Sequence, residues 1–365
     1  MNRKILVAFL SAALLMVFAA AGFAKSWDDR DAAGAVYTMT NDAAGNEVVI
    51  FNRGHNGVLT KTDSISTGGT GSGGGLDALA SQGALVLSED HRWLLAVNAG
   101  SNEVSVLRVL PEGLKLVDKV DSGGEFPVSV TIFHDLVYVL NAGMSPNITG
   151  FYLSYRGNLI PRAGSTRALG TGGFAQVGFD PRGETLVVTD RADRILVYPL
   201  DRVGLPAMNP VISTSNGSAP FAFIFDRRGH LLVVEAGSNA VSTYNILDNG
   251  TLQVISPSVA NGQIAACWIV GNSRGYVFTA NPGTSSISSY KLRHGNGMIS
   301  LLDGVAGIGN APLDLAISVN GRFLYALDPA NGGIDMYRIE RDGSLTDLGT
   351  VAGELSIFAQ GIAAR

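Results

Sequence analysis

Residues 83–117 read GALVLSEDHRWLLAVNAGSNEVSVLRVLPEGLKLV. This stretch holds four short apolar segments, at 84–87, 93–97, 104–109 and 114–117, which are separated by turn-forming residues. Short apolar runs bounded by Gly, Pro, Asn, Asp and Ser are typical of β-strands joined by tight turns. Four consecutive strands of this kind form one blade of a β-propeller. We label the strands of a blade A to D, from the innermost to the outermost.

The blade pattern recurs along the chain with a nearly fixed period. A turn with Gly shortly before Leu or Ile appears seven times, at Gly57, Gly113, Gly157, Gly204, Gly250, Gly297 and Gly343. After the first gap the spacings are 44, 47, 46, 47 and 46 residues. A period of this size with strand-like segments inside it predicts a propeller. Glycine suits these turns because it tolerates the positive φ that tight hairpins need.

The two ends of the chain are expected to close the ring. Segments 36–39, 48–51 and 59–61 supply only strands B, C and D of the first blade. The C-terminal FAQGIAAR (358–365) is similar to FAQVGF (174–179), which occupies the position of an A strand. We therefore predict an all-β chain, with residues 25–365 forming a single seven-bladed propeller of four-stranded antiparallel blades. Its C-terminal strand completes the N-terminal blade, which removes exposed sheet edges.

Residues 1–24 have the form of a secretory signal peptide. Asn2, Arg3 and Lys4 are followed by an apolar stretch (5–18) and by small residues at the expected cleavage site, near Ala24. A membrane anchor is the alternative, but the apolar stretch is short for a bilayer span. The mature protein should have no membrane span and is expected to be a secreted or periplasmic monomer.

Charge and cysteine content exclude several classes of partner. The chain has 26 basic and 31 acidic residues, a net charge of −5, and its basic residues are scattered. A nucleic-acid partner is therefore not expected. Cys267 is the only cysteine, so no internal disulfide can form, and its apolar neighbours predict burial. No cofactor and no metal site is predicted, which leaves a small molecule as the expected ligand.

Strand direction divides the loops between two faces of the ring. The A–B and C–D turns lie on one face, and the B–C and D–A loops lie on the other, around the channel. All five histidines, His55, His91, His134, His230 and His294, fall on the first face. The second face then lacks an imidazole for a Ser-His-Asp triad or for zinc. Its predicted ligand-binding residues are Asn98, Asn141, Gln176, Asp190, Arg191, Asn281 and Asp328, with Asp193 and Asp314 as further candidates.

Glu235 is the predicted catalytic residue, because burial beside Val234 would raise its pKa toward the range of a general acid or base. The alternative is that such polar residues cap strand ends and bind loop amides. The glycine-rich segment 66–83 also has two interpretations. It is either a flexible crossover between blades or a lid over the channel.

The blade sequences resemble those of a known family. The segments 88–98, 237–244 and 319–325 look like the blade consensus of seven-bladed propeller lactonases, which include propeller-type 6-phosphogluconolactonases and fungal carboxymuconate cyclases. The resemblance covers nearly the whole mature chain and implies opening or closing of a lactone ring. It also implies a glutamate on a B–C loop, which Glu235 matches, and a histidine and two arginines on D–A loops.

Those three D–A positions fall near Phe174, Phe221 and Leu313, which are apolar. Most of the family's site residues are thus expected to be replaced, in favour of a less anionic ligand. Arg191 or Arg194 is a candidate substitute for the missing cations. A non-catalytic propeller that binds a ligand or a partner through the same face is the alternative function.

Overall fold

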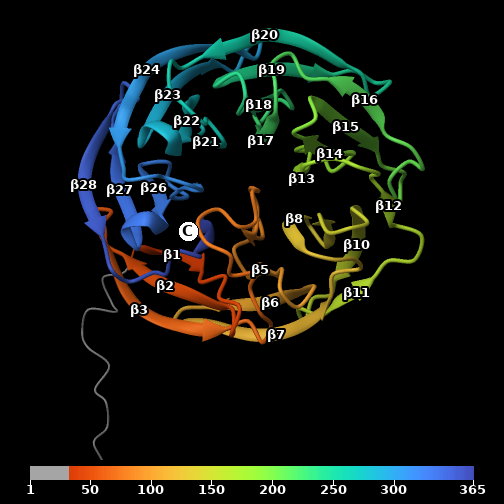
Figure 1. Cartoon of the computed structure of the whole chain (residues 1–365), viewed down its shortest axis with the longest axis horizontal. Helices are drawn as coiled ribbons and strands as arrows, with labels where there is room; N and C mark the ends of the chain where they lie inside the picture. Colours follow the sequence, from red (N-terminus) through yellow and green to blue (C-terminus); the bar gives the residue numbers. More distant parts are fainter. Residues whose placement is uncertain (1–32) are drawn as a thin grey trace, which may run out of the picture.

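Seven β-sheets surround a central axis in the computed structural model, which describes residues 33–365 (Figure 1). The described residues contain no α-helix, and their two short helical turns are the 3-10 segments η2 (Pro282–Thr284) and η3 (Pro329–Asn331). The predicted seven-bladed, all-β architecture is confirmed. The predicted signal peptide, 1–24, lies outside the described residues.

The blades follow one another along the chain, and each runs from an inner to an outer strand. Blade 1 contains β29 (Gln360–Ala364), β1 (Gly34–Met39), β2 (Glu47–Arg53) and β3 (Leu59–Ser66). Blade 2 contains β4 (Leu85–Leu87), β5 (Trp93–Asn98), β6 (Glu103–Leu110) and β7 (Gly113–Asp121). Blade 3 contains β8 (Pro127–Phe133), β9 (Leu136–Asn141), β10 (Asn147–Leu153) and an outer strand split into β11 (Leu159–Pro161) and β12 (Arg167–Ala168).

The other four blades have the regular four strands. Blade 4 contains β13 (Phe174–Phe179), β14 (Thr185–Asp190), β15 (Arg194–Pro199) and β16 (Val211–Thr214). Blade 5 contains β17 (Pro220–Phe225), β18 (Leu231–Glu235), β19 (Ala240–Ile246) and β20 (Leu252–Ala260). Blade 6 contains β21 (Trp268–Gly271), β22 (Tyr276–Asn281), β23 (Ser286–Arg293) and β24 (Met298–Ile308). Blade 7 contains β25 (Leu315–Ile317), β26 (Phe323–Asp328), β27 (Gly333–Ile339) and β28 (Leu345–Val351).

The ring closes as the sequence predicts. Strand β29 pairs antiparallel with β1, placing Tyr37 opposite Ala363 and Thr38 opposite Ile362. The Thr38 hydroxyl donates a hydrogen bond to the Gly361 carbonyl oxygen at 2.7 Å. The last strand of the chain therefore becomes the inner strand of the first blade, and this inner sheet edge stays paired.

The recurring glycines allow the blades to pack closely. Each adopts a positive φ, such as +91° at Gly57 and +92° at Gly343. A Cβ at Gly57 would lie 2.3 Å from the Phe323 ring, and one at Gly343 would lie 2.3 Å from the Tyr276 ring. Both rings belong to the preceding blade, at the start of its second strand. The C–D turns thus need glycine both for their backbone conformation and for contact between blades.

The glycine-rich segment lies inside the ring rather than running loosely between blades. Figure 1 shows this orange segment in the middle of the ring, ahead of β4. The Ser81 hydroxyl donates to the Val128 carbonyl at 2.8 Å, and the Trp268 indole N–H donates to the Ser81 carbonyl at 2.9 Å. The Gln82 backbone N–H donates to the Ala175 carbonyl at 3.2 Å. Blades 3, 4 and 6 therefore hold Ser81 and Gln82, near the end of residues 67–83, which we call the plug.

The distribution of histidines agrees with the prediction. His91, His134 and His230 lie between the first and second strands of their blades, and His55 and His294 lie between third and fourth strands. All five therefore lie on the face formed by the A–B and C–D turns. Within residues 33–365, no helix has the length and apolarity needed to span a membrane.

Candidate functional site

A ring of buried polar side chains marks the ends of the second strands of blades 2 to 7. We call them the clamp residues: Asn98, Asn141, Asp190, Glu235, Asn281 and Asp328. Each is 0% exposed. Six of the eight residues predicted to act in catalysis or ligand binding belong to this ring. Their hydrogen bonds decide whether they face a ligand or a neighbouring blade.

The Glu235 carboxylate accepts four hydrogen bonds. Its Oε1 accepts hydrogen bonds from the Gly217 N–H at 2.7 Å, the Ser215 hydroxyl at 3.0 Å and the Tyr244 hydroxyl at 3.2 Å. Its Oε2 accepts one from the Ser258 hydroxyl at 2.8 Å. Ser215 and Gly217 belong to the loop from blade 4, so the carboxylate joins two blades. This geometry is that of a strand-end cap, and the catalytic role of Glu235 stays a prediction.

Asn98 and Asn281 show the same arrangement. The Asn98 amide oxygen accepts from the Thr67 hydroxyl at 2.7 Å, while its amide nitrogen donates to Ser105 at 2.7 Å. The Asn281 amide oxygen accepts from the Asn261 amide at 2.8 Å. Thr67 and Asn261 each directly follow the last strand of the preceding blade. The clamp residues therefore link each blade to the loop that leaves the blade before it.

The two candidate arginines of blade 4 differ, because Arg194 forms an ion pair within the blade and Arg191 is exposed to solvent. Arg194 pairs with Asp190, whose other oxygen accepts from the Gly173 N–H at 2.8 Å. Because Arg194 is held in this ion pair, it is not available to replace the arginines that the family resemblance implies on the D–A loops. Arg191 is exposed, and its Nε donates to the Gly173 carbonyl at 3.1 Å.

A second carboxyl group, that of Asp335, lies next to the clamp residue Asp328. Asp328 accepts the Asn310 N–H at 2.6 Å, and Asp335 accepts the Thr350 hydroxyl at 2.6 Å. Burial raises the pKa of Asp335, and the adjacent Asp328 carboxylate raises it further, although the Thr350 hydrogen bond opposes both. The Asp328 charge therefore disfavours ionisation of Asp335, because two buried negative charges repel. The pair is nearly inaccessible, with Asp335 only 4% exposed.

The channel contains a cavity of about 500 Å³ below the plug, which we call the channel cavity. Gln82 and Gly83 of the plug line it, as do Pro181 and Phe225 at the A–B turns of blades 4 and 5. The inner strands of blades 1 to 5 and 7 form its wall. Most lining side chains are aliphatic or aromatic, with few polar groups among them. Small-molecule sites commonly have this composition.

Asp314 is the carboxyl group that lines the channel cavity. It is 6% exposed, and one carboxylate oxygen accepts the Leu315 N–H at 2.9 Å. Burial raises its pKa to about 7, and the Asp77 carboxylate contributes to the rise. Asp77 belongs to the plug, and burial raises its pKa to about 7 as well, against a lowering effect of Arg191. Strongly shifted carboxyl groups beside a cavity are candidates for proton transfer.

Two glutamine side chains, Gln82 and Gln176, line the channel cavity, and they differ in whether the amide NH₂ group has a hydrogen-bond partner. The Gln176 amide bonds twice to Phe223, accepting from its N–H at 2.7 Å and donating to its carbonyl at 3.0 Å. The Gln82 amide oxygen accepts the Ile269 N–H at 2.9 Å, which fixes the orientation of the amide. Its NH₂ group has no hydrogen-bond partner among the described residues. Gln82 is therefore an oriented donor, and sequence reasoning missed it because its segment has no strand pattern.

The positions that the resemblance assigns to family cations are apolar and buried. Phe174, Phe221 and Leu313 are 3%, 3% and 2% exposed, and the Phe221 ring packs edge-on against Trp268. Burial raises the pKa of Cys267 to about 12, so its thiol stays protonated. In the part of the chain that the structure describes, no group of three or more His, Cys, Asp or Glu is placed to hold a metal ion.

Comparisons with known proteins agree with this architecture. A family model described as "Lactonase, 7-bladed beta-propeller" matches residues 34–159 and 174–356. A search of curated protein sequences finds no match.

Solved structures share the fold at low sequence identity. A putative 6-phosphogluconolactonase from Bacteroides fragilis is 17% identical, with a TM-score of 0.73 over 91% of this chain and 98% of that one. The periplasmic gluconolactonase PpgL of Pseudomonas aeruginosa is 16% identical, with a TM-score of 0.73 over the same shares. A putative 6-phosphogluconolactonase from Bacteroides uniformis is 21% identical, with a TM-score of 0.69 over 90% and 99%.

Proposed function

Because the chain belongs to the seven-bladed β-propeller lactonase family, we propose that it hydrolyses an uncharged lactone in the channel cavity. Asp314 is the general base and acid, and the Gln82 amide is the donor to the carbonyl oxygen. The observation that carries the proposal is Asp314 itself, a buried carboxyl group with a pKa of about 7 on the cavity wall. A group with this pKa exchanges protons readily near neutral pH.

The reaction conserves atoms without a further reactant. The Asp314 carboxylate removes a proton from water as the water oxygen attacks the lactone carbonyl carbon. The Gln82 NH₂ group donates to the oxygen that becomes negative in the tetrahedral intermediate. The bond between the carbonyl carbon and the ring oxygen then breaks, and the ring oxygen takes the proton from Asp314. The product is a hydroxy acid.

The lining of the channel cavity supports an uncharged substrate. Val130, Val177, Phe179 and Phe223 supply apolar surface, and no lysine or arginine is among the described lining residues. An anionic substrate would lose its hydration without gaining a cation in return. The apolar residues at the three family positions support the same substrate class.

We also propose that this chemistry takes place outside the cytoplasm, in the periplasm or after secretion, by a monomer. The form of residues 1–24 supports export. One of the similar structures is named as a periplasmic protein. Fractionation of cells that express a C-terminally tagged chain should recover a tagged protein that lacks the first 24 or so residues outside the cytoplasm. Recovery of the full-length chain with the cytoplasm would overturn this part of the proposal.

A panel of uncharged lactones of increasing ring size and side-chain length tests the reaction. Purified wild type should hydrolyse at least one of them, and Asp314→Asn should lower kcat/KM by about 100-fold or more. Glu235→Gln is the matched control, because it keeps an acceptor oxygen for the clamp and should retain most activity. If Glu235→Gln loses turnover while its melting temperature is unchanged, Glu235 rather than Asp314 is the catalytic residue.

The second candidate is a non-catalytic propeller that binds a ligand. Replacement of the family cations by Phe174, Phe221 and Leu313 favours this function. Binding of a lactone without turnover, in wild type and Asp314→Asn alike, would establish it in place of hydrolysis.

A further inference from the structure

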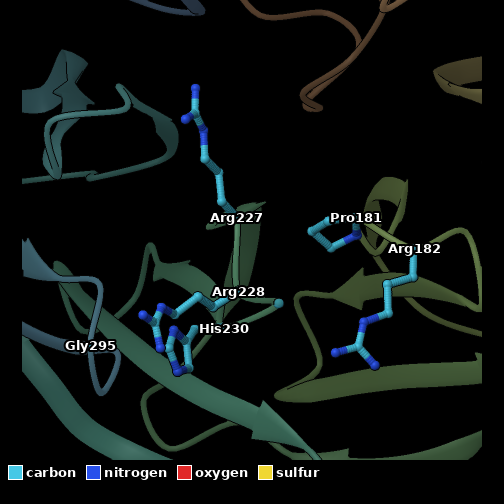
Figure 2. Close-up of a pocket in the computed structure, with 7 residues that line it drawn as sticks. Pro181, Arg182, Arg227, Arg228, His230 and Gly295 are labelled. Atoms are coloured by element: carbon cyan, nitrogen blue, oxygen red, sulfur yellow. The ribbon is translucent and has the colours of Figure 1, made fainter.

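A second hollow lies on the face that carries the A–B turns, and it differs in charge from the channel cavity. Its volume is about 450 Å³, and its lining comes from the A–B turns of blades 4 and 5 and the C–D turn of blade 6. Figure 2 shows Arg182, Arg227, Arg228 and His230 around it. We call this hollow the arginine pocket.

The arginines of the pocket lack strong internal partners. Arg227 and Arg228 are exposed and form no ion pair among the described residues. Arg182 lies 3.9 Å from the Glu184 carboxylate, and these side chains are 75% and 70% exposed. An exposed pair at this distance contributes little to stability. All three guanidinium groups are therefore available to an outside anion.

The buried carboxylate beside the pocket, Asp226, is engaged by histidines. Asp226 Oδ2 lies 2.8 Å from His230 Nδ1 and 3.5 Å from His294 Nδ1. Burial raises the pKa of Asp226, but hydrogen bonds from His230 and from the Arg228 N–H outweigh burial and leave the pKa low. A Cβ at Gly297 would lie 2.7 Å from the His230 ring, so this ring is also packed in place. His230, held by Asp226, is thus a fixed lining residue beside exposed arginines.

The pocket has room for a ligand against its backbone. A Cβ added at Gly229 or at Gly295 would meet no heavy atom within 4 Å. In Figure 2 the Arg228 and His230 side chains come from the same turn, Arg182 comes from the neighbouring turn, and Arg227 extends away from both. Rotation of these exposed side chains would bring their guanidinium groups over the hollow.

From this geometry we propose that the arginine pocket binds a tetrahedral oxyanion, a phosphate or sulfate group. Guanidinium groups match such anions because they donate two parallel hydrogen bonds to adjacent oxygens. This site differs in chemistry from the site of the proposed hydrolysis. Pro181 lines both hollows, but the arginines line only the arginine pocket, and the channel cavity has no lysine or arginine among its described lining residues. The group comes either from the free inorganic ion or from a small organic ester that carries it.

Calorimetric titration of the full purified chain with inorganic phosphate and with sulfate, at low ionic strength, tests the proposal. The double variant Arg227→Gln/Arg228→Gln should bind at least about tenfold more weakly. Arg341→Gln is the control, because Arg341 is an exposed arginine in the C–D turn of blade 7 and does not line the pocket. Its binding should equal that of wild type, and all three proteins should share one melting temperature in the absence of anion.

A further arm identifies the source of the anion. Tighter binding of phenyl phosphate than of inorganic phosphate supports a small organic ester, and equal or weaker binding supports the free ion. Absence of binding of every anion at about 10 mM would overturn the proposal. Binding that the double variant leaves unchanged would overturn it as well. Neither result depends on lactone turnover.

Discussion

The clamp residues and the few polar groups that line the channel cavity all lie inside the ring, but they use hydrogen bonds differently. Glu235 accepts four hydrogen bonds and is 0% exposed. Gln82 accepts one and keeps its NH₂ group free within the described residues. A buried polar group that is fully bonded stabilises the fold, and one that keeps capacity beside a cavity is available to a ligand. For this reason we assign the candidate site to the channel cavity and not to the strand ends where the clamp residues lie.

The largest expected effect on the cavity side of this comparison is the pH dependence that Asp314 gives to the free energy of unfolding. Its pKa is raised from 3.8 to about 7 in the folded protein, so its contribution to stability is full at low pH and is lost as pH rises through about 7. Asp314→Asn should remove up to about 4 kcal/mol of this dependence. Urea unfolding of wild type and variant from pH 4 to pH 8 measures it. Parallel stability curves would show that Asp314 is not a perturbed group.

The clamp side of the comparison is tested by Glu235→Ala. This change leaves Gly217 N–H and the hydroxyls of Ser215 and Ser258 without their acceptor. The free energy of unfolding should fall by about 3 kcal/mol, because buried donors lose their partner. Chemical denaturation measures the loss, with Glu235→Gln as the milder control. An equal stability of the alanine variant and wild type would contradict the structural role.

The oriented amide of Gln82 gives the next effect. Gln82→Met keeps a similar volume but removes the NH₂ donor, so kcat for a lactone substrate should fall by about 10- to 100-fold. Gln176→Met is the matched control, because that amide also lines the cavity but is bonded to Phe223. Steady-state kinetics of the two variants separates them. A larger loss of kcat in Gln176→Met would reverse the assignment.

The smallest effect concerns the carboxyl pair in the seventh blade. Asp335→Asn removes the second ionisable group beside Asp328 while keeping a side chain that hydrogen-bonds to it. Because the pKa of Asp335 is raised, wild type loses stability as pH rises, and the variant should keep more of its low-pH stability than wild type at pH 8. Thermal melting at pH 5 and pH 8 checks the sign. If the variant is less stable than wild type at pH 8, ionisation of Asp335 beside Asp328 does not destabilise the fold, and this prediction is wrong.

Much of the fold could be predicted because its determinants are local. The predicted strand segments 93–97 and 104–109 match β5 (Trp93–Asn98) and β6 (Glu103–Leu110) to within one residue at each end. Alternation and turn glycines fix such boundaries within a few residues of sequence. Closure of the ring was predictable for the same reason, since the tail repeats the pattern of an inner strand.

The site was less predictable because its geometry depends on distant contacts. The sequence placed the clamp residues at strand ends but gave no indication that their side chains bond to the preceding blade. The plug has no periodic pattern, and contacts from Val128, Ala175 and Trp268 determine its place. Asp314 was identified as a channel-face candidate, whereas its partner Gln82 was hidden in the glycine-rich segment.

A crystal structure of Asp314→Asn with a bound lactone substrate tests the location of the site most directly. We expect the lactone below the plug, with its carbonyl oxygen against the Gln82 amide and its ring against Phe223. A lactone bound above the plug, beside a displaced Glu235 or on Arg191, would contradict the assignment of the channel cavity as the site of hydrolysis.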